Sequence, residues 1–416
     1  MAKRLPFTTF TISVPELRRG YYTAVYFWRE KRVLEKENIN KHALMQVFNK
    51  VNGATICGID EALAILKLGT GYWKDYNKMY PLFDKYIRFK QELRIASVKN
   101  NFTEIEKLTS SICNIRHELN NLWVDTHNDL CIKALHDGDK SSAYDPVITI
   151  EGNASHFAHL ESIYLGVLAR STKLATNTRL VVDAANNKPI LFFCDRFDRW
   201  TNQVADGYAA MKSGVYGVAT DAMGEWWGVS GFGTIPHALI ALFDGNTTYA
   251  TLAFNKHYPD VRAIALVDFD NDCVNTSLNV ARSFADTGKD LWGVRLDTSE
   301  TMVDNSVINL MGQFKPTGVC APLVENVRKA LDKEGFSKVK IVVSGGFNPQ
   351  KISEFENAKI PVDAYGVGSW LLSGNYDYTA DIVLVNNKLM AKKGRIYKSN
   401  PNLKTFSWSE IEINEN

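Results

Sequence analysis

Six short apolar runs separated by amphipathic segments fill the second half of the chain, and they constrain its fold more than any other feature. The runs occupy residues 189–193, 215–219, 263–267, 291–295, 339–343 and 364–367. Continuous apolar runs of this length are typical of strands that are buried on both faces. Alternation of such strands with helices predicts an α/β fold, with either a parallel sheet or a (β/α) barrel. In these folds, ligands bind at the carboxyl ends of the strands.

The first part of the chain has a different texture, which changes near residue 150. We expect strands at residues 23–29, 51–57 and 145–150, because these stretches are rich in β-branched and aromatic residues. Residues 84–136 carry many charges and no proline, so we expect them to be mostly helical and solvated. Residues 156–171 read as a largely buried helix.

Length and composition exclude several classes of protein. A chain of 416 residues is long enough for about two domains. Its net charge of +2 gives no overall field for nucleic acid. No stretch approaches the ~18 apolar residues needed to span a membrane, and the N-terminus is a poor signal peptide. The six cysteines show no CxxC spacing and suit a reducing compartment. We therefore expect a cytoplasmic protein.

Glycine-rich turns follow the last two apolar runs. Ser344-Gly345-Gly346 comes after one run, and Gly366-Val367-Gly368-Ser369 ends the next. Glycines at such points let backbone N–H groups approach a phosphate, and a following helix N-terminus favours an anion. The alternative is a pair of tight strand–helix turns. Because the glycines recur at consecutive strand ends, phosphate binding is the better interpretation.

Three further strand ends carry candidate site residues. Arg295 and Asp297 lie two apart on a strand, hence on one face, and can clamp a diphosphate and bind ribose hydroxyls or Mg²⁺. A salt bridge without function is an equal alternative for this pair. Phe193 can stack on a flat ligand, and Arg196 can meet a carboxylate. Core packing and a surface ion pair are the alternatives there.

His237 lies in a segment that has the pattern of a helix start. Thr234 is a candidate cap and Pro236 suits the first turn. A helix N-terminus disfavours the imidazolium, so we expect a neutral ring that can attack a phosphoryl group. On spacing alone, a hydrogen-bonded core histidine is the more common explanation.

The order of five short motifs resembles the nicotinate phosphoribosyltransferases, which are type II phosphoribosyltransferases related to the nicotinamide and quinolinate enzymes. The motifs are GTIPHAL, LVDFD, GVRLDTSE, VSGGF and YGVGS, and the resemblance extends from about residue 20 to residue 395. It implies an irregular (β/α) barrel, residues 151–375, and a flanking α+β domain built from residues 1–150 and 376–416. It also implies a homodimer with active sites at the subunit interface.

The reaction implied by the resemblance joins nicotinate to phosphoribosyl pyrophosphate, giving nicotinate mononucleotide and pyrophosphate. It uses Mg²⁺ and is coupled to ATP hydrolysis through a phosphohistidine. No nucleic acid or membrane partner is expected.

The resemblance also assigns roles to residues. His237 matches the phosphorylated histidine, and Asp268, Arg295 and Asp297 match the ribose-diphosphate site. Phe193 and Arg196 match the groups that hold the pyridine ring, and Tyr26 matches a tyrosine that stacks on it from the partner subunit. Thr234 is expected at the substrate. The expected 5′-phosphate cradle consists of Ser344, Gly345, Gly346, Gly368 and Ser369.

The chain departs from the family pattern in three places. Ala24 replaces an aspartate, Asp297-Thr298-Ser299-Glu300 replaces Asp-Ser-Gly-Asp, and Phe193-Cys194-Asp195-Arg196 replaces an aromatic-glycine-x-arginine pattern. These changes affect the fine geometry of the site but remove no proposed catalytic group.

Ala219 carries the choice between nicotinate and nicotinamide. The nicotinamide enzymes have an aspartate at this position, and an aspartate would repel a carboxylate. Asp221, two residues on, would come closer if the alignment were shifted. Nicotinamide phosphoribosyltransferase therefore stays an alternative. So do a sugar-phosphate barrel enzyme, for which no strand-end lysine is found, and an inactive binding homologue.

Overall fold

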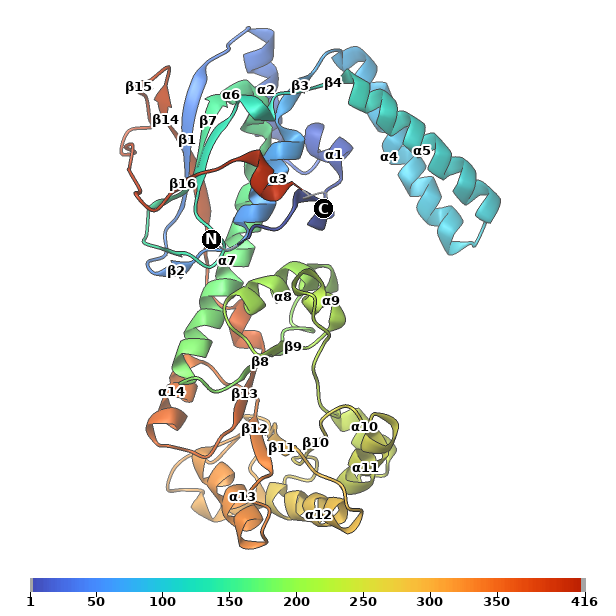
Figure 1. The fold of residues 1–416 in the computed structure, drawn as a ribbon, viewed down its shortest axis with the longest axis vertical. Coiled ribbons are helices and arrows are strands. Elements are labelled where there is room, and N and C mark those ends of the chain that lie inside the picture. The colour runs from blue at the N-terminus through green and yellow to red at the C-terminus, as the bar shows by residue number, and fades with distance from the viewer. Residues whose placement is uncertain (1–2, 413–416) are drawn as a thin grey trace. The chain divides into compact units, whose positions relative to one another are not determined.

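The computed structural model describes residues 3–412, which form two compact units (Figure 1). The first unit comprises Met1–Thr172 and Tyr376–Asn416, and the second comprises Lys173–Asn375. The first boundary lies inside the long helix α7 (Glu161–Ala184), beyond residue 150.

A six-stranded parallel sheet organises the second unit. Its strand order is β10-β11-β12-β13-β8-β9. All six apolar runs of the sequence form these strands, and most of the strand residues are buried. The strands are β8 (Ile190–Phe192), β9 (Gly217–Val218), β10 (Ile264–Leu266), β11 (Gly293–Leu296), β12 (Lys340–Val343) and β13 (Ala364–Val367).

This sheet is open, so the barrel expected from the sequence is not closed. Among residues 3–412, no strand pairing joins β9 to β10. The chain between η5 (Glu225–Trp227) and α10 (His237–Leu242) forms no strand. Gly228, Gly231, Gly233 and Pro236 lie in this stretch, and glycine and proline are poor strand formers.

Helices follow each strand of the second unit, as the alternation predicts. In α13 (Ala321–Lys333), Leu323, Val327 and Leu331 recur at helical spacing and are fully buried, which contributes about 1.5–3 kcal/mol per side chain. The remaining helices are α8 (Gln203–Lys212), α9 (Asp221–Gly224), α11 (Thr247–His257), α12 (Cys273–Asp286), α14 (Pro349–Asn357), η4 (Trp200–Asn202), η6 (Asn305–Leu310) and η7 (Ser369–Leu372).

An antiparallel six-stranded sheet organises the first unit, with the order β15-β14-β1-β7-β5-β16. Two long strands, β1 (His42–Asn49) and β7 (Pro146–Asn153), pair at its centre. β14 (Tyr378–Val385) pairs with β1, so the C-terminal segment completes a sheet begun near the N-terminus. The other strands are β5 (Cys131–Ala134), β15 (Lys388–Leu389) and β16 (Lys404–Thr405).

Most helices of the first unit pack beside this sheet, and two of them form a helical hairpin (Figure 1). The strand expected at 145–150 is confirmed by β7, and the buried helix expected at 156–171 is formed by α6 (Ala154–Phe157), η3 (Ala158–Leu160) and α7. The elements are η1 (Phe7–Thr9), α1 (Val14–Arg18), α2 (Val25–Lys36), α3 (Ile59–Gly69), α4 (Tyr76–Val98), α5 (Phe102–Leu122), η2 (His127–Asp129), α6 (Ala154–Phe157), η3 (Ala158–Leu160) and η8 (Trp408–Ile411).

The helical expectation for residues 84–136 is correct only to residue 122. Two antiparallel helices, α4 and α5, meet at a turn where Asn100 has φ +52° and Asn101 caps α5. Beyond them lie β4 (Trp123–Asp125), which pairs with β3 (Gly71–Trp73), and β5. Charge density predicts exposure well, but it does not mark where a helix gives way to a strand.

Two of the strands predicted for the first unit are not formed as expected: one is a helix, and the other is only two residues long. Residues 25–29 belong to α2, because Trp28 packs into an aromatic cluster with Trp73 and Trp123 from one face of a helix. Residues 51–57 contribute only β2 (Ala54–Thr55), which pairs with β6 (Lys140–Ser141). Just beyond β2, the N–H groups of Cys57 and Ile59 bond to side chains instead of a strand. Tertiary packing overrides β-propensity at both places.

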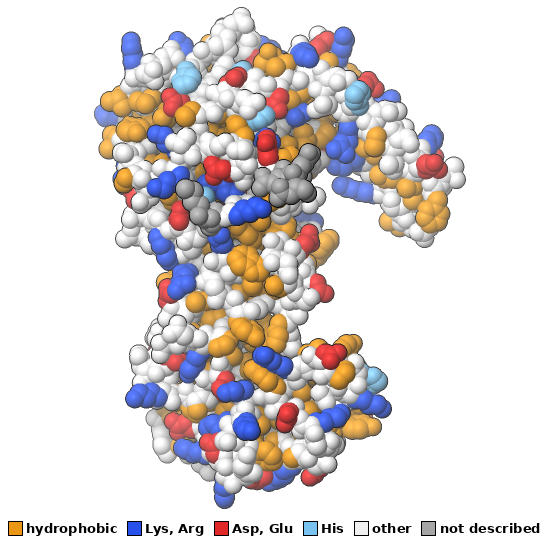
Figure 2. All heavy atoms as spheres, in the orientation of Figure 1, with side chains coloured by type: hydrophobic (Ala, Val, Ile, Leu, Met, Phe, Trp, Pro, Cys, Tyr) orange, Lys and Arg blue, Asp and Glu red, His pale blue; other side chains and the backbone are white. Residues whose placement is uncertain are grey.

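Charge is mixed over the visible surface. Basic and acidic side chains are interspersed on the face drawn in Figure 2. Within residues 3–412, no helix combines the length and apolar character needed to cross a bilayer.

Candidate functional site

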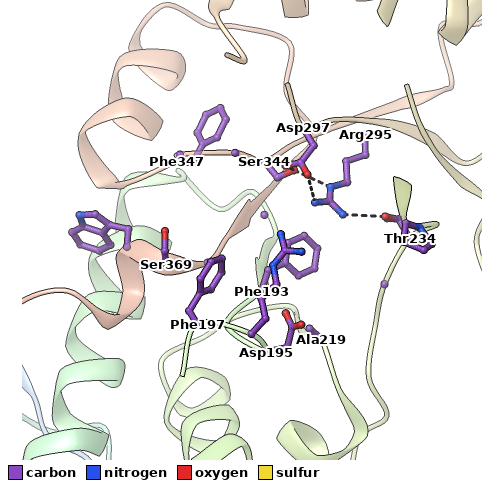
Figure 3. A pocket seen from close by; sticks show the side chains of 18 of the residues that line it. Phe193, Asp195, Phe197, Ala219, Thr234, Arg295, Asp297, Ser344, Phe347 and Ser369 are labelled. Atoms are coloured by element: carbon purple, nitrogen blue, oxygen red, sulfur yellow. Dashed lines mark hydrogen bonds and ion pairs between the residues drawn. The ribbon is translucent and has the colours of Figure 1, made fainter. Parts of the chain in front are cut away.

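A cavity of about 530 Å³ opens at the carboxyl ends of the parallel strands in the second unit (Figure 3). Its walls come from the ends of β8, β9, β11, β12 and β13 and from the chain that precedes α10. The predicted site residues that line it are Phe193, Arg196, Ala219, Thr234, Arg295, Asp297, Ser344, Gly345, Gly346, Gly368 and Ser369.

Arg295 is the most highly connected side chain of the cavity. Its Nε donates to Ser344 Oγ at 2.8 Å, its Nη1 to Thr234 Oγ1 at 3.1 Å, and its Nη2 to Asp297 at 3.0 Å. The guanidinium carbon also lies 4.9 Å from the centre of the Phe193 ring. One cation therefore joins the aromatic wall, the acid and two neighbouring loops.

Ser344 and Asp297 hold Arg295 in place. The Ser344 hydroxyl is almost fully buried and donates to Asp297 Oδ1 at 2.6 Å while it accepts from Arg295. Its hydrogen-bonding capacity is thus directed to this pair. The phosphate-type character of the loop comes instead from Gly345 and Gly346, whose φ angles of +80° and +69° are adopted readily only by glycine.

Two consecutive left-handed residues of this kind shape a concave backbone that suits an anion. The helix α14 follows directly, and the Asn348 side chain caps it by accepting from the Lys351 N–H at 2.9 Å.

Phe193 and the loop of Gly368 pack tightly against each other. A side chain at Gly366 would stand 2.5 Å from the Phe193 ring, and one at Gly368 would stand 2.5 Å from Phe197 and 2.8 Å from the Phe193 carbonyl. The Phe193 N–H donates to Val367 O, and the Cys194 thiol lies 3.2 Å from Gly368 O. The glycines of this motif therefore allow close packing at the ring as well as an open loop.

His237 and Asp268 form a pair beside the cavity, and neither of them is a lining residue. His237 Nε2 lies 3.1 Å from each Asp268 carboxylate oxygen, and 44% of the histidine side chain is exposed while Asp268 is nearly buried. The hydrogen bond to Asp268 raises the pKa of His237 above its ordinary value, despite partial burial.

This raised pKa corrects the expectation of a ring kept neutral by a helix N-terminus. α10 does begin at His237, but it has only six residues, and the carboxylate of Asp268 has the larger effect. Pro236 is the N-cap residue and makes no side-chain cap. Thr234 does not cap the helix either, because its hydroxyl accepts from Arg295 and bonds to the Ile235 carbonyl.

Tyr26 belongs to the first unit, in α2, where 62% of the residue is exposed. Its ring lies 4.3 Å from that of Phe27.

Several lining residues were not singled out from the sequence. Asp195 is the most consequential, because it adds a carboxylate to the cavity that Ala219 also lines (Figure 3). It belongs to a quoted motif, but a residue between two others on a loop has no periodicity that reveals its direction. Asp221, in contrast, is absent from the lining, and its carboxylate accepts from the Gly231 N–H at 2.8 Å. The other lining residues not assigned a role are Phe197, Phe232, Gly233, Ile235, Pro236, Glu300, Phe347, Asn348, Gly366 and Trp370.

The cavity contains carboxylate oxygens that could bind a cation, but the described residues form no complete metal-binding site. In residues 3–412, no three histidine, cysteine, aspartate or glutamate side chains gather as metal ligands. Three carboxylates, those of Asp195, Asp297 and Glu300, line the cavity. Such a set fits Mg²⁺, which is commonly held by one or two carboxylates and completed by substrate phosphates and water.

Comparison with known proteins finds similar sequences and structures that carry the names of nicotinate enzymes. No family model matches the chain. The nicotinate phosphoribosyltransferase pncB1 of Mycobacterium tuberculosis is 28% identical over 263 residues, which is 62% of this chain and 54% of that protein. The chain thus spans about half the length of the curated relatives it matches.

Two solved structures have the same fold. A nicotinate-nucleotide pyrophosphorylase from Pyrococcus furiosus aligns with a TM-score of 0.68 and 27% identity, covering 93% of this chain and 81% of the other. Human nicotinic acid phosphoribosyltransferase aligns with a TM-score of 0.60 and 14% identity, covering 88% and 75%.

Proposed function

Because this chain is related in sequence and fold to the nicotinate phosphoribosyltransferases, we propose that it joins nicotinate to phosphoribosyl pyrophosphate. The products are nicotinate mononucleotide and pyrophosphate. One observation carries the proposal: a single cavity unites an aromatic wall, an arginine–aspartate pair and two glycine loops from neighbouring strand ends. A flat base, a diphosphate and a 5′-phosphate each need one of these. We place the reaction in the cytoplasm, where ATP and phosphoribosyl pyrophosphate are made.

The pyridine ring packs on Phe193, with its carboxylate toward Arg196. The Arg295 guanidinium lies against the Phe193 ring and keeps that ring in place. We propose that Tyr26 covers the other side of the base from the partner subunit of a homodimer. The exposure of Tyr26 in α2 makes it available for such a role.

The phosphoribosyl group binds along the strand ends. Gly345, Gly346, Gly368 and Ser369 receive the 5′-phosphate, with Ser344 fixing the geometry of the loop. Arg295 binds the diphosphate, and Asp297 binds the ribose hydroxyls. Bond formation at the anomeric carbon passes through a cation-like state, so these groups mainly position the substrates and stabilise the departing charge. Mg²⁺, held by Asp297 and the substrate phosphates, would neutralise charge on the leaving diphosphate.

His237 couples the reaction to ATP. Asp268 holds Nε2, so a neutral ring keeps its lone pair on Nδ1, which is the atom we propose to accept the γ-phosphoryl group. The bond between Nδ1 and phosphorus forms as the bond to ADP breaks, and water later releases phosphate. Thr234 links the segment before His237 to Arg295, so phosphorylation acts next to the diphosphate site.

Ala219 favours nicotinate, because no acid at this position opposes the substrate carboxylate. A second candidate substrate, nicotinamide, is favoured by Asp195, whose carboxylate lines the same cavity as Ala219 and can accept from an amide.

A substrate panel tests the proposal. Purified protein with Mg²⁺, ATP and phosphoribosyl pyrophosphate is offered nicotinate, nicotinamide or quinolinate separately, and mononucleotides are separated by chromatography. We expect nicotinate mononucleotide as the main product. A preference for nicotinamide would assign the site to the second candidate, and no mononucleotide from any base would reject the proposal.

A further inference from the structure

Glu300 lies on the glycine loop that the proposed function gives to the 5′-phosphate. A Cβ atom built on Gly346 would stand only 1.7 Å from Glu300 Oε1 and 2.7 Å from its Cδ. The carboxylate is therefore in van der Waals contact with the backbone of Gly346. It lines the same cavity as Gly345 and Gly346.

The two carboxylates that face this loop differ in their partners. Asp297 lies against Gly345 and is neutralised by Arg295 and Ser344. Within residues 3–412, Glu300 makes neither a hydrogen bond nor an ion pair. Lys351 of α14 is a cation on which Glu300 acts through space. The charge of Glu300 is therefore not neutralised by a direct contact.

From this placement we infer that Glu300 is a resident anion of the phosphate loop, and that the 5′-phosphate must displace it in order to bind. The inference rests on the proposed function, because it needs a phosphate at Gly345 and Gly346. Two anions at one concave backbone repel each other, so the affinity for a phosphate-bearing substrate is lower than the loop alone would give. Glu300 is exposed and follows the end of β11, so its side chain can swing away while the loop stays in place. It is an affinity-determining residue and not a catalytic one.

Calorimetric titration with ribose 5-phosphate in the absence of Mg²⁺ tests the inference without any transfer reaction. The proteins are wild type, Glu300→Gln, which loses the charge but keeps the size, and Glu300→Ala, which loses both. Glu225→Gln is the matched control, because Glu225 is an exposed glutamate of the same unit outside the cavity lining. We expect Glu300→Gln to bind about fivefold more tightly than wild type, the factor for two like charges about 4 Å apart in water.

Glu300→Ala should bind at least as tightly as Glu300→Gln, and Glu225→Gln should match wild type. The advantage of Glu300→Gln should shrink at high salt, because screening weakens the repulsion. Equal or weaker binding by Glu300→Gln would overturn the inference and make Glu300 a binding group.

The experiment distinguishes failure of the Glu300 inference from failure of the proposed function. A wild-type protein that binds ribose 5-phosphate but transfers nothing to any base would reject the reaction and leave the inference open to the same comparison. If neither wild type nor Glu300→Gln binds ribose 5-phosphate, the inference is wrong, whatever the bases do.

Discussion

Two regions of the site are built in different ways: the glycine–arginine side of the cavity, formed by Arg295, Asp297, Ser344 and the glycine turns, and the histidine loop, which leads to His237. Arg295, Asp297 and Ser344 project from adjacent parallel strands and bond to one another, so the sheet fixes them. His237 begins a six-residue helix after a stretch without secondary structure, and one carboxylate holds its ring. The first side is suited to hold a charged substrate in one position. The second is suited to the role we propose for His237, whose ring would be phosphorylated and dephosphorylated in each catalytic cycle.

Replacing Arg295 should have the largest effect, since it removes the centre of the fixed side. We expect Arg295→Ala to lower kcat/KM about 10²–10³-fold, the usual cost of deleting a preorganised group that stabilises developing charge. Arg295→Lys should recover little, because an ammonium cannot reproduce three directed bonds. Steady-state kinetics with varied phosphoribosyl pyrophosphate measures this effect, and near-normal rates in both variants would remove Arg295 from the mechanism.

Ala219→Asp tests the base site between the two sides. An added carboxylate should lower kcat/KM for nicotinate about tenfold or more and raise the relative rate with nicotinamide. Competition between the two bases in one reaction gives the ratio directly. Ala219→Asn is the matched control, since it adds the bulk without the charge. Equal effects of the two substitutions would mean that size, and not charge, limits this site.

His237→Ala tests the histidine loop. The variant should take up no label from γ-labelled ATP, and its transfer rate should fall to the level that wild type shows without ATP. His257→Ala is the control, because His257 is an exposed histidine at the end of α11. Equal labelling of wild type and His237→Ala would contradict the phosphohistidine role.

Asp268→Asn should have the smallest effect on rate and a clear effect on pH dependence. Phosphorylation needs a neutral imidazole, and Asp268 raises the pKa of His237. Labelling of wild type should therefore fall as pH drops through this raised pKa, and the acid limb should move to lower pH in Asp268→Asn. For stability the sign is opposite: the ion pair contributes fully below the unfolded pKa and is lost as pH rises through the folded one. Thermal unfolding should thus separate the two proteins at acid pH and bring them together at alkaline pH.

The sequence predicted the second unit far better than the first. Its six strands are largely buried, so each leaves a continuous apolar run, and the residues after them meet at one edge. In the first unit, β1 pairs with a strand about 100 residues away and with another near the C-terminus, which no local pattern reveals. Residues 25–29 became a helix because Trp28 and Lys31 are buried together on one of its faces.

Within the site, the direction of a loop side chain was the main feature that could not be predicted. Asp195 and Glu300 point into the cavity, whereas Asp221 bonds to the Gly231 backbone. The state of His237 was misjudged for a related reason. Its helix start is visible in the sequence, but the contact with Asp268, 31 residues later, depends on tertiary structure.

The most direct test of the central claim is a phosphorus NMR time course of wild type and Arg295→Ala with nicotinate, Mg²⁺ and phosphoribosyl pyrophosphate, first without ATP and then with it. Wild type should convert the substrate into pyrophosphate and nicotinate mononucleotide in equal amounts, faster after ATP is added, while Arg295→Ala stays nearly silent. Release of pyrophosphate without the mononucleotide, or no loss of phosphoribosyl pyrophosphate at all, would contradict phosphoribosyl transfer to nicotinate.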